Sequence, residues 1–290
     1  DDVRIIYNEL YNASGQNYKP KDDCAVFKAL QDYGIIIFIK KYKQDEYNHH
    51  VLYYRVNPRR VLENHNYIGI FNSKNIDKLI KKFNILIKTV SPFLPEFDSC
   101  NISRIDYCSN VELNDQAVID SYINLLKRGY FPSKYTIKKY KNEKSKRNTL
   151  SKNGITITGN NGIEVTYYNK YRQLKEKNPK CRYIDNSKKI IRIEIRCFKK
   201  KVRHLTKKFK CTSASSFLKE SDIIGKYIFK HYANIFYGTG DFYKLTDIYA
   251  MIDKSSCKKK SKKVMKELVK SSATHSSLDR AFDILNFNKS

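Results

Sequence analysis

A tyrosine near the middle of the chain has the neighbours that nucleophilic attack on a phosphodiester requires. Tyr168 ends a stretch of alternating apolar and polar residues and is followed two positions later by Lys170. A second alternating stretch carries Glu194 between Arg192 and Arg196. A phenol has a pKa of about 10, so at neutral pH it needs a base or a nearby cation before it can attack phosphorus. A carboxylate beside several cations is a setting that suits this chemistry, and a divalent cation on the phosphate together with Lys170 would supply that help.

Tyr168 has to be weighed against two other interpretations. The chain contains 23 tyrosines, and a tyrosine that packs at the end of a strand needs no chemical role. Tyr171 follows shortly after and is the second candidate nucleophile. Tyr167 should point to the opposite face from Tyr168, because side chains alternate along a strand. The predicted catalytic set is therefore Tyr168 with Lys170, and Tyr171 as the alternative nucleophile.

Two acidic residues are predicted to bind a metal ion. Asp106 and Glu194 each lie within an apolar strand pattern, where an unpaired carboxylate is costly. Mg²⁺ or Mn²⁺ would compensate that charge through oxygen ligands. The alternative is an ion pair of each acid with Arg104, Arg192 or Arg196. Two acids on separate strands would also suit a metal-dependent nuclease that forms no tyrosine intermediate.

An ordered set of short motifs resembles a known family. The motifs are Asn57-Pro58, Arg104-Ile105-Asp106, Tyr168-Asn169-Lys170 and Arg192-Ile193-Glu194. In this order they resemble the filamentous-phage gene II/X replication proteins and the related Rep_trans-type plasmid initiators, which are rolling-circle replication initiators. The resemblance covers most of the chain. It implies a tyrosine that nicks one DNA strand and stays covalently attached to it, and an RRM-like α+β core.

His50 is a third candidate metal ligand. HUH endonucleases hold their metal with two histidines that flank one hydrophobic residue on a strand, so both face the same way. Here His49 and His50 are adjacent and would face opposite sides, which departs from that pattern. His50 could act as a single ligand beside the carboxylates, and the alternative is a loop histidine without a metal.

The charge of the chain points to a polyanionic partner. Lys and Arg number 57 against 29 Asp and Glu, a net charge of +28, and nucleic acid is the commonest partner of so basic a chain. The arginines predicted to contact DNA phosphates are Arg55, Arg59, Arg60, Arg104, Arg192 and Arg196. The basic segments 138–147 and 199–210 are further candidates for a DNA-tracking surface. Ordinary solvated surface charge is the alternative.

Other function classes are disfavoured by what the sequence lacks. It has no apolar run of about 18 residues, so a membrane partner is not expected. The 7 cysteines include no Cys-x-x-Cys pair, which disfavours a zinc ribbon and favours reduced cysteines in a cytoplasmic protein. No signal peptide is visible. No Gly-x-x-x-x-Gly-Lys loop is present, so a helicase, like the polymerase, would have to come from the host.

Residue periodicity predicts an α+β fold. Strands are predicted over residues 34–40, 51–56, 101–113, 155–158, 163–168 and from 190 onward, and helices over 75–90 and 116–128. An antiparallel sheet with helices on one face, RRM-like or HUH-like, would accommodate this order. Residues 199–210 are expected to form a basic bridge, and helices are predicted at 217–236, 241–253, 258–270 and 276–287. The predicted domains are a nicking domain, 1–211, and a small all-helical C-terminal domain, 212–290.

Together these patterns predict a rolling-circle DNA replication initiator. It would recognise an origin duplex, act on a single-stranded loop within it, and leave a 5′-phosphotyrosyl link and a free 3′-hydroxyl. A conjugative relaxase with the same chemistry is one alternative. A non-catalytic DNA-binding replication protein, which keeps only the basic surface, is the other.

Overall fold

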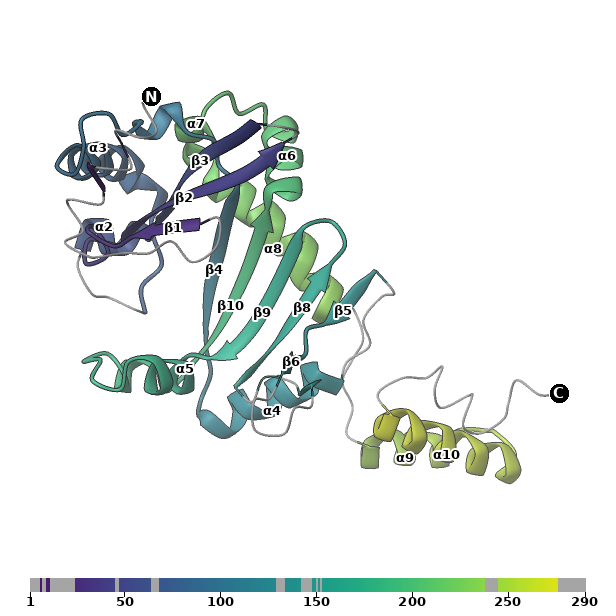
Figure 1. Cartoon of the computed structure of the whole chain (residues 1–290). Coiled ribbons are helices and arrows are strands. Elements are labelled where there is room, and N and C mark those ends of the chain that lie inside the picture. Colours follow the sequence, from purple (N-terminus) through teal and green to yellow (C-terminus); the bar gives the residue numbers. More distant parts are fainter. Residues whose placement is uncertain are drawn as a thin grey trace. The chain divides into compact units, whose positions relative to one another are not determined.

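The computed structural model describes residues 6, 9–10, 24–44, 47–63, 68–128, 134–141, 148–149, 151, 153–237 and 245–275. The chain forms two units, and each collects segments that are far apart in the sequence. The first unit contains the segments Asp1–Ile105, Cys181–Ser187 and Cys197–Gly225, and the second contains Asp106–Lys180, Lys188–Arg196 and Lys226–Ser290. Figure 1 labels most of the helices and strands of both units.

The first unit is built on a three-stranded antiparallel sheet with the strand order β1-β2-β3. Its elements are β1 (Cys24–Phe27), β2 (Ile35–Gln44), β3 (Tyr47–Val56), α2 (Pro58–Glu63), η1 (Ser73–Asn75), α3 (Ile76–Lys88), η2 (Phe97–Ser99), η3 (Asp185–Ser187), α6 (Lys199–Lys208) and α7 (Ala214–Lys219). Gly34 ends the turn before β2 with a φ of 83°, which favours glycine. A Cβ there would lie 2.5 Å from Cβ of Arg60, so the turn also requires that no side chain be present.

Helix α3 supplies much of the core of the first unit because its apolar residues recur at helical spacing. Leu79, Phe83 and Ile87 are each at most 1% exposed, and they share one core cluster with Ile35 and Ile37 of β2. Because side chains alternate along a strand, the residues between these isoleucines point to the other face of the sheet.

The second unit is built on a five-stranded sheet with the order β4-β10-β9-β8-β5, and it also has a two-stranded sheet of β6 and β7. Its elements are β4 (Arg104–Glu112), α4 (Gln116–Arg128), β5 (Tyr135–Ile137), β6 (Tyr140–Lys141), β7 (Asn148–Thr149), β8 (Gly154–Gly159), β9 (Ile163–Asn169), α5 (Lys170–Lys177), β10 (Ile190–Phe198), α9 (Leu245–Lys254) and α10 (Lys259–His275). Helix α8 (Ser221–Tyr237) begins in the first unit and ends in the second. Figure 1 shows β8, β9 and β10 side by side in the larger sheet.

Alternation along the strands gives this larger sheet an apolar face and a polar face. Ile191, Ile193 and Ile195 of β10 are at most 6% exposed and point to the apolar face, as the sequence predicts. Helix α4 packs there, because its Ile119 and Ile123 belong to one core cluster with Ile191. The residues that alternate with these isoleucines form the polar face, which carries the candidate site.

The predicted α+β fold is confirmed as antiparallel sheets with helices, including helices in the C-terminal part of the chain. The strands form two main sheets where one was expected, because strand pairing depends on contacts between distant segments. Residues 199–210 were expected as a bridge and mostly form α6, whose buried Val202 and Leu205 give it an apolar side. The predicted helix 276–287 lies outside the described residues. Within the described ranges, no helix has the length and apolarity needed to cross a bilayer.

Candidate functional site

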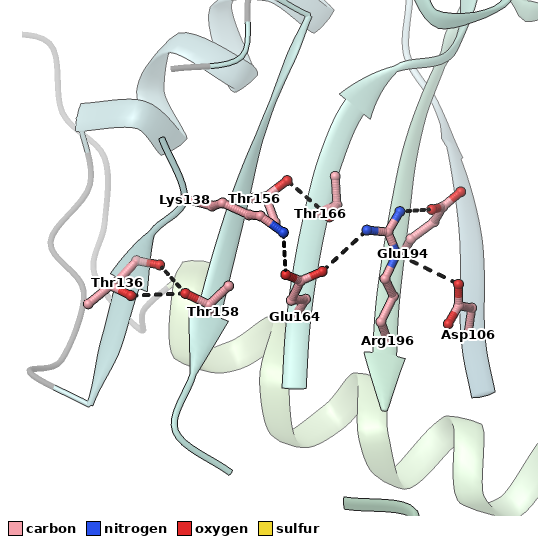
Figure 2. A network of polar contacts seen from close by, with 9 residues as sticks. All are labelled: Asp106, Thr136, Lys138, Thr156, Thr158, Glu164, Thr166, Glu194 and Arg196. Atoms are coloured by element: carbon pink, nitrogen blue, oxygen red, sulfur yellow. Dashed lines mark hydrogen bonds and ion pairs between the residues drawn. The ribbon is translucent and has the colours of Figure 1, made fainter. Parts of the chain in front are cut away.

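Polar side chains from neighbouring strands gather on the polar face of the larger sheet, as Figure 2 shows. Those drawn are Asp106, Thr136, Lys138, Thr156, Thr158, Glu164, Thr166, Glu194 and Arg196. The antiparallel register pairs Thr156 with Thr166 and Thr158 with Glu164. Residues two apart on one strand share a face, so this register lines up the polar side chains in rows across the sheet.

Tyr168 lies on the same polar face, two residues beyond Thr166 in β9. Its hydroxyl donates a 2.5 Å hydrogen bond to Oε1 of Glu194. Burial raises the pKa of the Tyr168 phenol, and the negative charge of Glu194 raises it further. The phenol therefore stays protonated at neutral pH, and an acceptor for its proton is already in place. Tyr167 is fully buried on the opposite face, as the sequence predicts.

The Tyr168-Asn169-Lys170 motif joins β9 to α5. The Asn169 side chain accepts a hydrogen bond from a backbone N–H three residues later, which caps the helix and ends the strand. Lys170 is the first residue of α5 and is 4% exposed. Its Nζ lies 5.8 Å from the centre of the Tyr168 ring. Burial, followed by the nearby charge of Arg192, lowers the pKa of Lys170 to about 8.

Arg196 is the cation that the carboxylates of this face share. Its guanidinium lies 3.6 Å from Asp106, 3.3 Å from Glu164 and 3.4 Å from Glu194. Glu164 also accepts a 2.8 Å hydrogen bond from Nζ of Lys138. Burial alone would raise the pKa of Glu164, but the two cations together lower it below its ordinary value. Figure 2 shows Arg196 between these acids from three strands.

The predicted metal ligands Asp106 and Glu194 thus lie on one face, and both contact the guanidinium of Arg196. Carboxylate oxygens are suitable ligands for Mg²⁺ and Mn²⁺. Among the described residues, however, no three His, Cys, Asp or Glu side chains are grouped as a metal site requires. The carboxylates as arranged fit a guanidinium better than a divalent cation, which is the ion-pair alternative. The involvement of Mg²⁺ or Mn²⁺ stays a prediction.

The remaining predicted site residues have other surroundings. Arg192 of the second unit is 7% exposed, and its Nε donates a 2.8 Å hydrogen bond to Oδ1 of Asn110. In the first unit, the guanidinium of Arg104 lies 5.6 Å from the centre of the Phe198 ring. His50 is an exposed residue of β3 in that same unit.

Three predicted DNA-binding arginines also belong to the first unit. The guanidinium of Arg55 lies 4.8 Å from the centre of the Phe38 ring. Arg59 donates to the backbone oxygen of Ile70 at 3.2 Å, and Arg60 donates to a backbone oxygen in the turn before β2 at 3.4 Å. Arg55 is exposed, whereas Arg59 and Arg60 are half-buried. Of the three, Arg55 is therefore the most available to a ligand.

The alternative nucleophile Tyr171 lies in α5 and has different neighbours from Tyr168. The ammonium groups of Lys175 and Lys188 each lie 6.0 Å from the centre of its ring. In the part of the chain that the structure describes, no carboxylate accepts a hydrogen bond from its hydroxyl. Of the two candidates, Tyr168 is therefore the one with a base beside it.

Glu164 was not predicted as a site residue, and Lys138 was predicted only as the start of the basic segment 138–147, but both belong to the same polar network. The sequence contained a signal for Glu164. Residues 164, 166 and 168 are two apart on one strand and must share the face that carries Tyr168. Cys108 was not predicted as a site residue either. Burial raises the pKa of its thiol to about 11, and the negative charge of Glu194 adds to that effect. Glu164 and Lys138 thus add one carboxylate and one cation to the face, and the Cys108 thiol stays neutral at pH 7.

Comparison with family models, curated proteins and solved structures found no match to this chain. A function for this chain therefore has to be inferred from the arrangement of its own residues.

Proposed function

We propose that this protein nicks one strand of DNA by tyrosine transesterification, as rolling-circle replication initiators do. The observation that carries the proposal is the hydrogen-bonded series Tyr168, Glu194 and Arg196. A hydroxyl that donates to a base, with the base held by a third group, is a general arrangement for activating a nucleophile. The net charge of +28 suits a polyanionic substrate such as DNA.

In the proposed step, Oη of Tyr168 attacks the phosphorus of a phosphodiester while its proton passes to Oε1 of Glu194. The bond from phosphorus to the 3′-oxygen of the preceding nucleotide breaks, and that oxygen takes up a proton. The products are a phosphotyrosyl link to the 5′ end and a free 3′-hydroxyl. One phosphodiester bond replaces another, so the step needs no ATP and is reversible.

The cations around Tyr168 support the same step. Lys170 lies beside the ring and carries a positive charge at neutral pH because its pKa is about 8. It would stabilise the negative charge that grows on the phenolic oxygen and the phosphate in the transition state. Arg196 holds the second oxygen of Glu194 at 3.4 Å and so keeps this carboxylate turned toward the phenol.

The proposal includes the partners that the family resemblance implies. These are an origin duplex with a single-stranded loop, a host helicase, and a host polymerase that extends the free 3′-hydroxyl. One observation favours the second candidate, a DNA-binding protein without catalysis. Arg196 already forms ion pairs with Asp106, Glu164 and Glu194, so the network can also serve a purely structural role.

Mapping a covalent adduct tests the proposal. Supercoiled plasmid carrying the DNA that flanks the coding region is incubated with the protein, with and without Mn²⁺, and the DNA-linked peptide is identified by mass spectrometry. We expect nicked circles and an adduct at Tyr168. Tyr168→Phe should abolish both, and Tyr171→Phe serves as the matched control. Nicking by Tyr168→Phe would refute the assigned nucleophile, and DNA binding without any nicking would favour the second candidate.

A further inference from the structure

The first unit has a sheet face that its core does not use. The register of β2 and β3 places Phe38 opposite Tyr53, Lys40 opposite Val51 and Ile36 opposite Arg55. We call the surface formed by Ile36, Phe38, Lys40, Tyr42, Val51, Tyr53 and Arg55 the aromatic face. The isoleucines that alternate with its β2 members point into the core on the other side of the sheet.

The aromatic rings of this face are accessible to a ligand. Tyr42 is 44% exposed and Val51 is 38% exposed. Phe38 and Tyr53 are half-buried, and neither belongs to the core cluster of the unit. The hydroxyl groups of Tyr42 and Tyr53 lie 3.0 Å apart in a hydrogen bond, which fixes the two rings side by side. The face therefore presents ordered rings on a rigid antiparallel sheet.

Cations alternate with these rings. The guanidinium of Arg55 lies 4.8 Å from the centre of the Phe38 ring, and Nζ of Lys40 lies 5.6 Å from the centre of the Tyr53 ring. Both cations are exposed, and in the described residues neither has a carboxylate partner. Each ring thus has a positive charge beside it that remains available to an anion.

We propose that the aromatic face binds a single strand of DNA, with bases stacked on Phe38 and Tyr53 and phosphates held by Lys40 and Arg55. Every base has a flat face that can stack on an aromatic ring, and a basic surface beside the rings attracts the backbone. Duplex DNA cannot bind in this way because its bases are already stacked on each other. A second copy of the chain is a poor occupant of this face. A two-fold contact would bring together Lys40 and Arg55 of both copies, four positive charges in all.

This proposal concerns binding and is independent of whether Tyr168 is the nucleophile. The chain contains no tryptophan, so one introduced tryptophan gives a signal from a single position. In Phe38→Trp, addition of a twelve-nucleotide oligothymidine should quench the tryptophan emission. An abasic oligonucleotide of the same length should not, because it has phosphates but no bases. Phe93→Trp is the control, since Phe93 is 57% exposed in the same unit but lies outside the aromatic face.

Fluorescence anisotropy of a labelled oligothymidine then measures affinity. Loss of one stacking ring should weaken binding by about 5- to 150-fold, so we expect this range for Phe38→Ala and Tyr53→Ala, with Phe93→Ala unchanged. Phe38→Leu keeps apolar bulk and should weaken binding similarly, which separates stacking from a folding defect. Lys40→Ala should reduce the salt dependence of binding by about 0.7 in the log–log slope.

Four results would overturn the proposal. The first is unchanged affinity in both alanine variants while circular dichroism shows that they are folded. The second is equal quenching of Phe38→Trp by the abasic oligonucleotide, which would leave no role for stacking. The third is sedimentation showing that the wild type is a dimer and Phe38→Ala is a monomer, because the occupant would then be a second copy. Equal binding of an RNA oligonucleotide would overturn the commitment to DNA.

Discussion

The hydroxyl of Tyr168 donates a 2.5 Å hydrogen bond to Oε1 of Glu194. The phenol is largely buried, and both burial and the charge of Glu194 raise its pKa. Tyr168 is therefore not a spontaneous phenolate at neutral pH, and its reactivity depends on the transfer of a proton to Glu194 during attack. This relationship makes Glu194 a base in the proposed chemistry, a role that the sequence analysis did not assign to it.

Replacing the base should slow nicking without removing the nucleophile. Glu194→Gln keeps the shape of the side chain but cannot take a proton, so we expect the nicking rate to fall by about 10²- to 10⁴-fold. Glu176→Gln is the matched control, because Glu176 bonds to Asn153 and takes no part in the proposed chemistry. Rates come from single-turnover assays on supercoiled plasmid. Equal rates for Glu194→Gln and wild type would show that Glu194 is not the base.

The pH dependence of nicking should report on Lys170. The pKa of this lysine is lowered to about 8, so its charge is lost as the pH rises through 8, and the nicking rate should fall there. In Lys170→Arg the charge persists to higher pH. The falling limb of the pH profile should therefore move upward in that variant, even if the maximal rate decreases. If the falling limb lies at the same pH in both proteins, the titration of a group other than Lys170 causes it.

The same lowered pKa has a consequence for stability. Folding disfavours the charged form of Lys170, so between the folded-state pKa of about 8 and the ordinary value of 10.5 the unfolded chain binds more protons than the native one. The contribution of Lys170 to the free energy of unfolding should therefore increase across this interval. Urea unfolding of the wild type and of Lys170→Met, measured at pH 7 and pH 10, isolates the contribution. If the difference between the two proteins is constant with pH, the lysine is not desolvated.

The sequence predicted the strands around the site well because their patterns are local. In IEVTYYN and IIRIEIRCF the alternation alone decides which residues share a face with Tyr168 and Glu194. No helix is predicted for the polar, basic segment after Asn169, but Asn169 is a good helix cap and α5 begins directly after it. A high density of lysines concealed the helical period of this segment and of α6.

The partner of each carboxylate could not be predicted from the sequence. Whether Asp106 and Glu194 hold a metal ion or an arginine depends on the order of strands in the sheet and on their register. The strand order β4-β10-β9 brings Asp106, Glu164 and Glu194 around Arg196. Strand order is set by contacts between residues far apart in the chain, and a single sequence gives no local signal for it.

Glu164 should make the second unit sensitive to acid. Its pKa is lowered in the folded protein by Lys138 and Arg196, so its stabilising contribution is present above the ordinary value of 4.5 and is lost as the pH falls through the lower folded value. Glu164→Gln removes this contribution. We expect the free energy of unfolding of wild type and variant to differ at pH 7 and to converge toward pH 3, as measured by urea unfolding. A difference that does not change with pH would mean that Glu164 is not ionised in these ion pairs.

Removal of Arg196 tests both the ion-pair network and the predicted metal. Arg196→Met leaves Asp106, Glu164 and Glu194 without their shared cation, and because the Arg196 side chain is 30% exposed we expect a loss of about 1–3 kcal/mol in urea unfolding. Arg203→Met, at an exposed position of α6, is the control and should lose little. Mn²⁺ should restore part of the lost stability in Arg196→Met, because the freed carboxylate oxygens suit this ion. If Mn²⁺ stabilises the wild type and Arg196→Met equally, the guanidinium does not compete with the metal, and the ion binds at another place in the chain.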